Sequence, residues 1–163
     1  MSTEPPASPP SPSPPVPEAR VPSAHAARAS EGPTPEELDE GGRAEALVAA
    51  SLGVGRYTRH VLLCTGPTCA SAPVATAAWA YLKARLRQLE QEGKLPAQDV
   101  YRTKVGCLRV CRGGPICVVY PDGTWYREAT ADNLPRILDE HLVHGRVVAD
   151  LAFASNPLGG PGA

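Results

Sequence analysis

Four of the five cysteines lie in two short segments, each directly after a stretch that predicts a β-strand. Cys64 and Cys69 enclose four residues, and Cys107 and Cys111 enclose three. The apolar run 60–64 and the alternating segment 99–105 predict the two strands. Residues 73–92, between a proline and a glycine, predict a helix that links the strands in parallel. Both cysteine loops should therefore emerge at the same end of one sheet, where four thiols can converge.

Several kinds of site use four converging thiols. Structural disulfides are disfavoured in a reducing compartment, and neither pair has the Cys-x-x-Cys spacing of thioredoxin-type redox motifs. Structural zinc bound by all four thiolates is a serious alternative, although zinc knuckles favour two intervening residues. A two-iron, two-sulfide cluster is larger, and its paired thiolates suit wider and unequal loops. The spacing alone leaves the cluster and zinc open.

The segments after the second cysteine loop predict the rest of the fold. Residues 116–120 and 124–127 read as strands joined by a Pro-Asp-Gly turn, and residues 131–144 read as a helix with Asn133 as N-cap. The expected order is β-α-β-β-β-α. A parallel crossover next to an antiparallel hairpin gives a small mixed sheet with two helices, which is an α/β sandwich of thioredoxin-like type.

The N-terminal third of the chain has a different composition. Eleven of the 19 prolines fall within residues 1–35, which predicts a disordered leader over residues 1–55 with a short helix within 35–52. The folded domain is expected over residues 56–152, and residues 153–163 are expected to form a flexible tail. The chain contains no apolar run of 18 residues and begins without a secretory h-region. We therefore expect a cytoplasmic protein with no membrane partner.

The charge is distributed unevenly along the chain. Residues 1–55 carry a net charge of −5 and residues 56–163 a net charge of +4. The basic part contains no Lys/Arg block and few aromatic residues, so nucleic-acid binding is not predicted, whereas an acidic protein partner is compatible with the charge. Arg109 and Arg112 lie in and directly after the second cysteine loop, where they could face such a partner.

The residues of the domain resemble those of a known family. The resemblance runs from about residue 58 to about residue 150 and rests on the two cysteine loops, the Gly-Pro of residues 114–115 and the Tyr-Pro-Asp-Gly-x-Trp-Tyr of residues 120–126. Together these segments resemble the thioredoxin-like [2Fe–2S] ferredoxins. A related domain occurs in the iron–sulfur subunits of NADH dehydrogenases and bidirectional hydrogenases, so a subunit of a larger oxidoreductase is a second interpretation.

The resemblance implies one [2Fe–2S] cluster, which serves one-electron transfer with redox protein partners. It implies a homodimer as well. Its ligands, carried over residue by residue, would be Cys64, Cys69, Cys107 and Cys111. A four-cysteine zinc domain for protein interaction stays as the alternative.

Other reactive residue types receive structural interpretations. Cys117 lies in the middle of a predicted strand, where a free cysteine behaves as a small buried hydrophobe. None of the four histidines lies in a cysteine loop, so we expect surface or helix-end positions for them. Asp122 and Asp132 are interpreted as turn and cap residues. The sequence shows no combination of a nucleophile, a general base and a general acid. We therefore predict an electron carrier rather than an enzyme.

Three further expectations concern the loops and the hairpin. Gly66, Gly113 and Gly114 should allow close backbone approach and positive φ. A cis bond is compatible with Pro115. Of the two aromatic residues 125 and 126, alternation places one inward and one outward.

Overall fold

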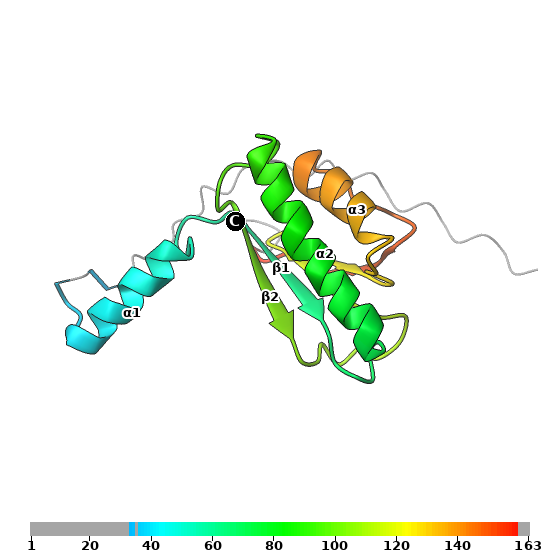
Figure 1. Ribbon diagram of the computed structural model, residues 1–163, viewed down its shortest axis with the longest axis horizontal. Coiled ribbons are helices and arrows are strands. Elements are labelled where there is room, and N and C mark those ends of the chain that lie inside the picture. The colour runs from blue at the N-terminus through cyan, green and yellow to red at the C-terminus, as the bar shows by residue number, and fades with distance from the viewer. Residues whose placement is uncertain (1–32, 35, 160–163) are drawn as a thin grey trace, which may run out of the picture.

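The computed structural model describes residues 33–34 and 36–159, and most of the predicted leader lies outside these residues. In the described part, five strands form one mixed sheet (Figure 1). These are β1 (Arg59–Cys64), β2 (Val100–Val105), β3 (Cys117–Tyr120), β4 (Thr124–Tyr126) and β5 (Ala152–Ser155). Their order is β2-β1-β3-β4-β5, with β1 and β2 parallel and the other pairs antiparallel. The predicted α/β class and thioredoxin-like sandwich are confirmed.

The crossover between the parallel strands is α2 (Ala72–Gln91), which begins one residue after Ser71 and includes Pro73 in its first turn. Its apolar residues recur every three or four positions and form one buried stripe: Ala75, Ala78, Leu82, Leu86 and Leu89. Gly93 follows the helix with φ of 67°. This amphipathic pattern places α2 against one face of the sheet, as predicted.

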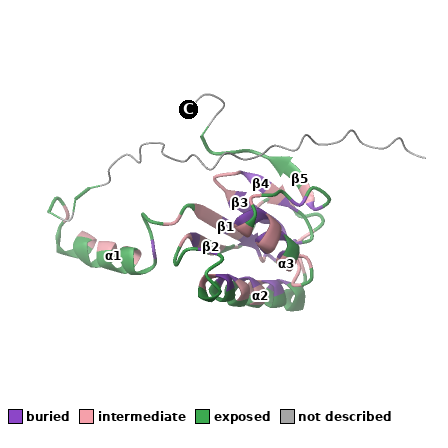
Figure 2. Ribbon diagram, turned by 90° about the horizontal axis from the view of Figure 1, so that it is seen from above, coloured by how far each residue is buried: buried purple, intermediate pink, exposed green. Residues whose placement is uncertain are grey.

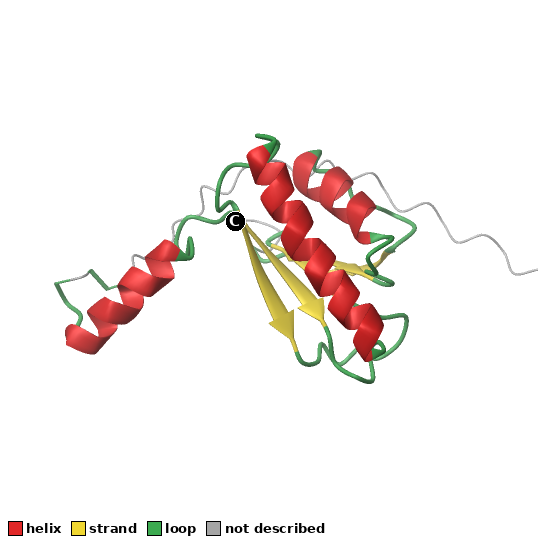
Figure 3. Ribbon diagram, viewed as in Figure 1, coloured by secondary structure: helices red, strands yellow, loops and turns green. Residues whose placement is uncertain are grey.

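The second predicted helix has an irregular form. It consists of α3 (Leu134–Arg136) and a wider π-helical stretch, η1 (Ile137–Val143), in which the His144 N–H donates to the Asp139 carbonyl at 3.2 Å. Asn133 lies at the N-cap, but its side chain donates to the Glu128 carbonyl at 3.0 Å. This helix and α2 cover the same face of the sheet (Figures 2 and 3).

Two apolar clusters occupy the two faces of the sheet. The larger one lies between the sheet and the helices and includes Leu63, Cys117 and Tyr126. The smaller one includes Cys64, Cys69 and Ile116, with the half-buried Trp125 packed against it. Tyr126 therefore points inward and Trp125 outward, in agreement with the predicted alternation.

The C-terminal segment differs from the prediction. Residues 152–155, expected to lie mostly in a flexible tail, form β5 and pair with β4. The Gly123 turn packs against Asn156, whose N–H donates to the Gly123 carbonyl at 2.8 Å. Without β5, the backbone N–H and C=O groups at the edge of β4 would have no hydrogen-bond partners, and β5 provides them. No pattern in the sequence of β5 indicates this pairing.

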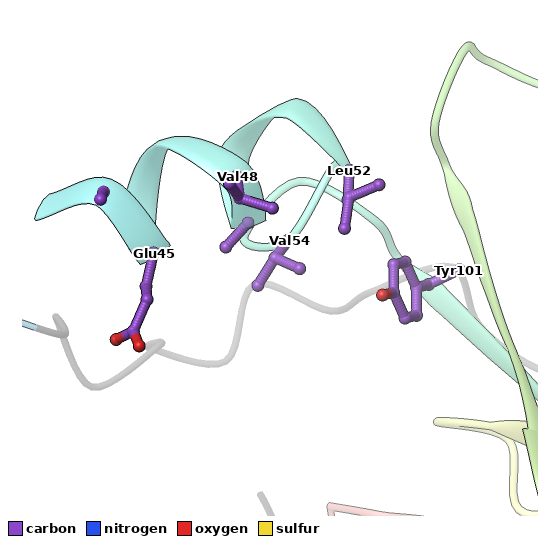
Figure 4. Close-up of a pocket in the computed structure, with 7 residues that line it drawn as sticks. Glu45, Val48, Leu52, Val54 and Tyr101 are labelled. Carbon is purple, nitrogen blue, oxygen red and sulfur yellow. The ribbon is translucent and has the colours of Figure 1, made fainter. Parts of the chain in front are cut away.

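The short helix expected within residues 35–52 is present as α1 (Glu40–Ser51). The Asp39 carboxylate accepts a hydrogen bond from the Gly42 N–H at 2.8 Å. Gly41 and Gly42 therefore lie in a capped first turn and do not interrupt the helix. α1 contains no buried residue and projects from the sheet (Figure 1). A hollow of about 450 Å³ lies between α1 and Tyr101, with Val48, Leu52 and Val54 around it (Figure 4).

That hollow lies at the start of β2, whereas the cysteine loop follows the end of this strand. No helix among residues 33–34 and 36–159 is long and apolar enough to cross a membrane.

Candidate metal centre

The two cysteine loops meet at the carboxyl ends of the parallel strands. Cys64 is the last residue of β1, and Cys69 precedes the first turn of α2. The Thr65 N–H donates to the Val105 carbonyl at 3.0 Å, which joins the first loop to the end of β2. The Thr68 hydroxyl lies 3.5 Å from the Cys111 sulfur. The predicted convergence of the two loops at one end of the sheet is therefore present.

The four cysteines of the loops differ in their exposure. Cys64 is 1% exposed and Cys69 is 9% exposed, and both pack with Ile116 in the smaller apolar cluster. Cys107 and Cys111 are exposed. The first loop thus offers a pair of sulfurs on the protein side, and the second loop offers a pair on the solvent side.

All five cysteines are free thiols. Within the described ranges, no group of three His, Cys, Asp or Glu side chains gathers closely enough to hold one metal ion. A tetrahedral zinc site needs four donors around a single point, whereas a two-iron cluster is held by donors in two separated pairs. The two loops supply four thiols, which are donors of the type that either group uses.

Hydrogen-bond donors surround the sulfurs of these loops. The Arg109 N–H donates to the Cys107 sulfur at 3.2 Å, and Arg109 holds a positive φ of 64° in doing so. The Ile116 backbone forms a hydrogen bond with the Cys69 sulfur, and the Thr68 hydroxyl approaches that of Cys111. Such donors stabilise negative charge on sulfur, and they lower the energy of an electron-rich thiolate group.

Burial affects the acidity of the Cys69 thiol. Its pKa is raised to about 11, chiefly by burial and also by the neighbouring Cys64 and Cys111, while the hydrogen bond from the Ile116 backbone opposes this rise. With no cation present, the Cys69 thiol stays protonated near neutral pH. Binding of a cationic group must therefore displace its proton, as is usual for thiolate ligands.

Two glycines let the loops come together. A Cβ on Gly66 would overlap the Gly106 carbonyl oxygen, and a Cβ on Gly114 would overlap the backbone of Cys69 and lie 2.5 Å from its sulfur. Gly113, with φ of 65°, occupies the left-handed region. The predicted close backbone approach is confirmed at Gly66 and Gly114 and the predicted positive φ at Gly113 alone, and the Gly114–Pro115 bond is cis. The donor set, its hydrogen bonds and this close backbone packing fit a thiolate-bound inorganic cluster.

The structure keeps Cys117 apart from these four cysteines. Its side chain is fully buried in the larger cluster, on the opposite face of the sheet from Cys64 and Cys69. Desolvation raises its thiol pKa to about 12, so it is an inert core residue.

A buried polar network lies on the helix side of the sheet, and the sequence patterns did not reveal it. His141 is 1% exposed, its Nδ1 lies 2.9 Å from the Tyr126 hydroxyl, and its Nε2 lies 3.2 Å from an Asp122 carboxylate oxygen without hydrogen-bond alignment. The Arg59 guanidinium lies 3.4 Å from the same oxygen. The surface or helix-end position expected for His141 is wrong, and Asp122 is more than a turn residue. Only the packing of η1 onto the hairpin brings these residues together.

The remaining histidines are not associated with the cysteine loops. His60 lies 2.7 Å from the Thr103 hydroxyl in the neighbouring strand, and His144 is exposed. His25 falls outside the described residues.

The chain is similar in sequence to several curated proteins. It is 42% identical over 55 residues to "Ferredoxin, 2Fe-2S" of Clostridium pasteurianum, covering 34% of this chain and 54% of that protein. It is 31% identical over 86 residues to a "Putative 2Fe-2S ferredoxin" of Priestia megaterium, covering 53% of this chain and 62% of that protein. The matches thus span about half to three-fifths of the curated relatives. No protein-family model matches the chain.

Solved structures share the fold. The thioredoxin-like [2Fe–2S] ferredoxin of Aquifex aeolicus matches with a TM-score of 0.52 and 23% identity over 64% of this chain and 98% of that one. A 1.5 Å crystal structure of the wild-type protein from the same organism matches with a TM-score of 0.53 and 24% identity over 61% and 99%. At this level of identity the structural likeness concerns the fold alone.

Proposed function

We propose that the chain is a thioredoxin-like [2Fe–2S] ferredoxin, which binds one [2Fe–2S] cluster and exchanges single electrons with protein partners, and its similarity to curated 2Fe-2S ferredoxins supports this. When bound, such a cluster supplies a one-electron redox couple. The observation that carries the proposal is the convergence of the two cysteine loops at one end of the sheet, where the Thr68 hydroxyl of the first loop lies 3.5 Å from the Cys111 sulfur of the second.

The proposed ligands are Cys64, Cys69, Cys107 and Cys111. Cys64 and Cys69 would hold the inner side of the cluster, against the apolar cluster around Ile116. Cys107 and Cys111 are exposed, so they would hold its outer side, where an electron-transfer partner can approach. The apolar inner wall excludes water, which is one of the means by which a protein sets a cluster potential.

The loop donors have a defined role in this proposal. The backbone N–H of Arg109 and the backbone of Ile116 donate to ligand sulfurs, and reduction adds negative charge to the group that those sulfurs bind. These hydrogen bonds therefore stabilise the reduced state. No acid–base step is required of the chain, in keeping with a carrier rather than an enzyme. The proposal places the protein in the cytoplasm, where free thiols stay reduced before cluster insertion.

Metal analysis of anaerobically purified protein tests the proposal. We expect about two irons and about two acid-labile sulfides per chain, with visible absorption that bleaches on reduction. Cys107→Ala removes a proposed ligand and should lose iron and colour, whereas Cys117→Ala changes a core thiol and should keep both. Colourless protein with one zinc per chain would refute the proposal. Equal colour in the two variants would refute the ligand assignment.

A further inference from the structure

The cations of the described residues fall into two groups. Five of them pair with carboxylates within 4 Å: Arg59, Arg85, Lys94, Arg136 and Arg146. The other nine form no ion pair within the part of the chain that the structure describes, and three of these nine, Lys83, Arg102 and Lys104, are exposed near one another. These three of the unpaired cations share one side of the molecule.

These three residues border the groove between α2 and the edge strand β2, and we call them the basic flank. Val100, Arg102 and Lys104 are alternate residues of β2, so their side chains lie on the same face of the strand. Because Val100 packs into the larger apolar cluster, this face is the helix side. Lys104 and Trp79 line the same hollow of about 150 Å³. The Lys83 ammonium lies 6.0 Å from the centre of the Trp79 ring. The flank thus combines three positive charges with one half-buried aromatic ring.

The basic flank adjoins the cysteine loops. Thr65, which directly follows Cys64, lines the same hollow as Lys104 and Trp79. Lys104 is paired in register with Leu63, the residue before Cys64. The exposed Arg109 and Arg112 add two further positive charges in and after the second loop, and neither pairs with a carboxylate among the residues described. A protein seated on the flank therefore lies next to the first cysteine loop.

Acidic side chains near the flank do not neutralise it. The Glu90 carboxylate, on the same side of α2, accepts a hydrogen bond from the Gln98 N–H at 3.0 Å, near the start of β2. The Asp99 carboxylate accepts one from the Thr58 hydroxyl at 2.8 Å, at that same end. The end of the flank nearest the cysteine loops keeps its positive charge.

We propose that the basic flank is the docking surface for an acidic redox partner protein, whose Asp and Glu side chains pair with Lys83, Arg102 and Lys104 while an apolar group covers Trp79. The proposal rests on the proposed function, which requires a partner close to the cysteine loops. Complementary charge accelerates encounter and fixes the orientation of a partner. Duplex nucleic acid fits less well, because its binding commonly uses six to ten phosphate contacts.

The test compares two double variants of the cluster-loaded protein that change the net charge equally. Lys83→Glu with Lys104→Glu reverses the flank. Arg43→Glu with Arg146→Glu is the control with the same change in net charge. Arg43 lies on α1. Arg146 follows η1, whose Leu142 carbonyl contacts Arg59 at the start of β1. Binding of the oxidised protein to an acidic cytochrome of the b5 type and to basic cytochrome c is measured by titration calorimetry at low ionic strength. In a separate experiment the protein is first reduced with dithionite, freed of excess reductant and mixed with each oxidised cytochrome, and the one-electron reduction of the cytochrome is followed by stopped flow.

We expect wild type to bind the acidic cytochrome more tightly than the basic one. The flank variant should raise the dissociation constant for the acidic cytochrome by about tenfold, and the control variant by less than about twofold. At about 1 M salt the Debye length falls to about 3 Å, and this difference should disappear.

Several outcomes would overturn the inference: equal binding by both variants, a preference for cytochrome c, tighter flank-dependent binding to a DNA duplex, or flank-dependent self-association in sedimentation. Flank-dependent binding without any cytochrome reduction would support the docking surface and contradict the electron-transfer function. Reduction at equal rates by both variants and wild type would support the function and contradict the docking surface.

Discussion

Two facing glycines give the sharpest test of how the cysteine loops are packed. Gly66 lies in the first loop, and a Cβ there would overlap the Gly106 carbonyl oxygen, which is a backbone atom that cannot rotate away. Gly106 opens the second loop, and a Cβ there would meet no atom within 4 Å. Neither residue has a positive φ. Gly66→Ala and Gly106→Ala therefore differ only in the space around the added methyl group.

The comparison isolates the steric cost. Each substitution reduces the conformational entropy of the unfolded chain, which stabilises the folded state by about 0.4–1 kcal/mol, and this contribution cancels between the two variants. Overpacking costs about 1–3 kcal/mol when a well-packed backbone must shift. We expect Gly66→Ala to be less stable than Gly106→Ala by that amount. For a folded region of roughly 100 residues, the difference corresponds to about 4–24 °C in Tm.

Thermal unfolding of the two purified variants measures this difference, and visible absorption per chain gives a second reading. Gly66→Ala separates the two loops and should lower both Tm and colour, whereas Gly106→Ala should keep the colour and match or exceed the wild-type Tm. Equal melting temperatures for the two variants, or greater damage from Gly106→Ala, would refute the close approach of the loops.

Three further predictions concern the helix side of the sheet. Tyr126→Phe leaves the buried His141 Nδ1 without its hydroxyl partner and should cost about 1–3 kcal/mol in urea unfolding; an unchanged midpoint would contradict this. Burial by itself raises the pKa of the Asp122 carboxyl, but His141 and Arg59 hold it below its usual range. The stabilisation is therefore complete above about pH 4 and lost as the pH falls through the folded-state pKa. Asp122→Asn should remove that part of the acid dependence, and a wild-type acid profile in the variant would count against it. Cys117→Ser places a hydroxyl in the apolar core and should lower stability by about 1–3 kcal/mol without loss of iron, whereas loss of iron would make Cys117 a ligand.

Local patterns predicted the parts of the fold that depend on neighbouring residues. The apolar stripe of α2 and the alternation in β2 follow from helical and strand periodicity. The crossover rule then places the ends of β1 and β2, and hence both cysteine loops, at one end of the sheet. The turn after Tyr120 follows from turn chemistry, and alternation predicts that Trp125 and Tyr126 point to opposite faces, although the structure decides which one is inward. These inferences needed no knowledge of distant contacts.

Features that depend on distant contacts could not be predicted in this way. β5 has only four residues, and its pairing with β4 is decided by the free edge of that strand. His141 is buried because η1 packs on the hairpin, which brings its ring to Asp122 and Tyr126. A histidine three residues before the end of the predicted helix (131–144) carries no local signal of such partners.

The amino-acid sequence alone determined which residues could bind a metal group, because four thiols at the ends of two predicted strands are constrained by chain connectivity. It did not determine that Cys64 and Cys69 are buried while Cys107 and Cys111 face solvent, nor which cations pair with carboxylates. Burial and ion pairing depend on which surfaces meet across the sheet. Those contacts join segments far apart in the chain, and only the tertiary structure brings them together.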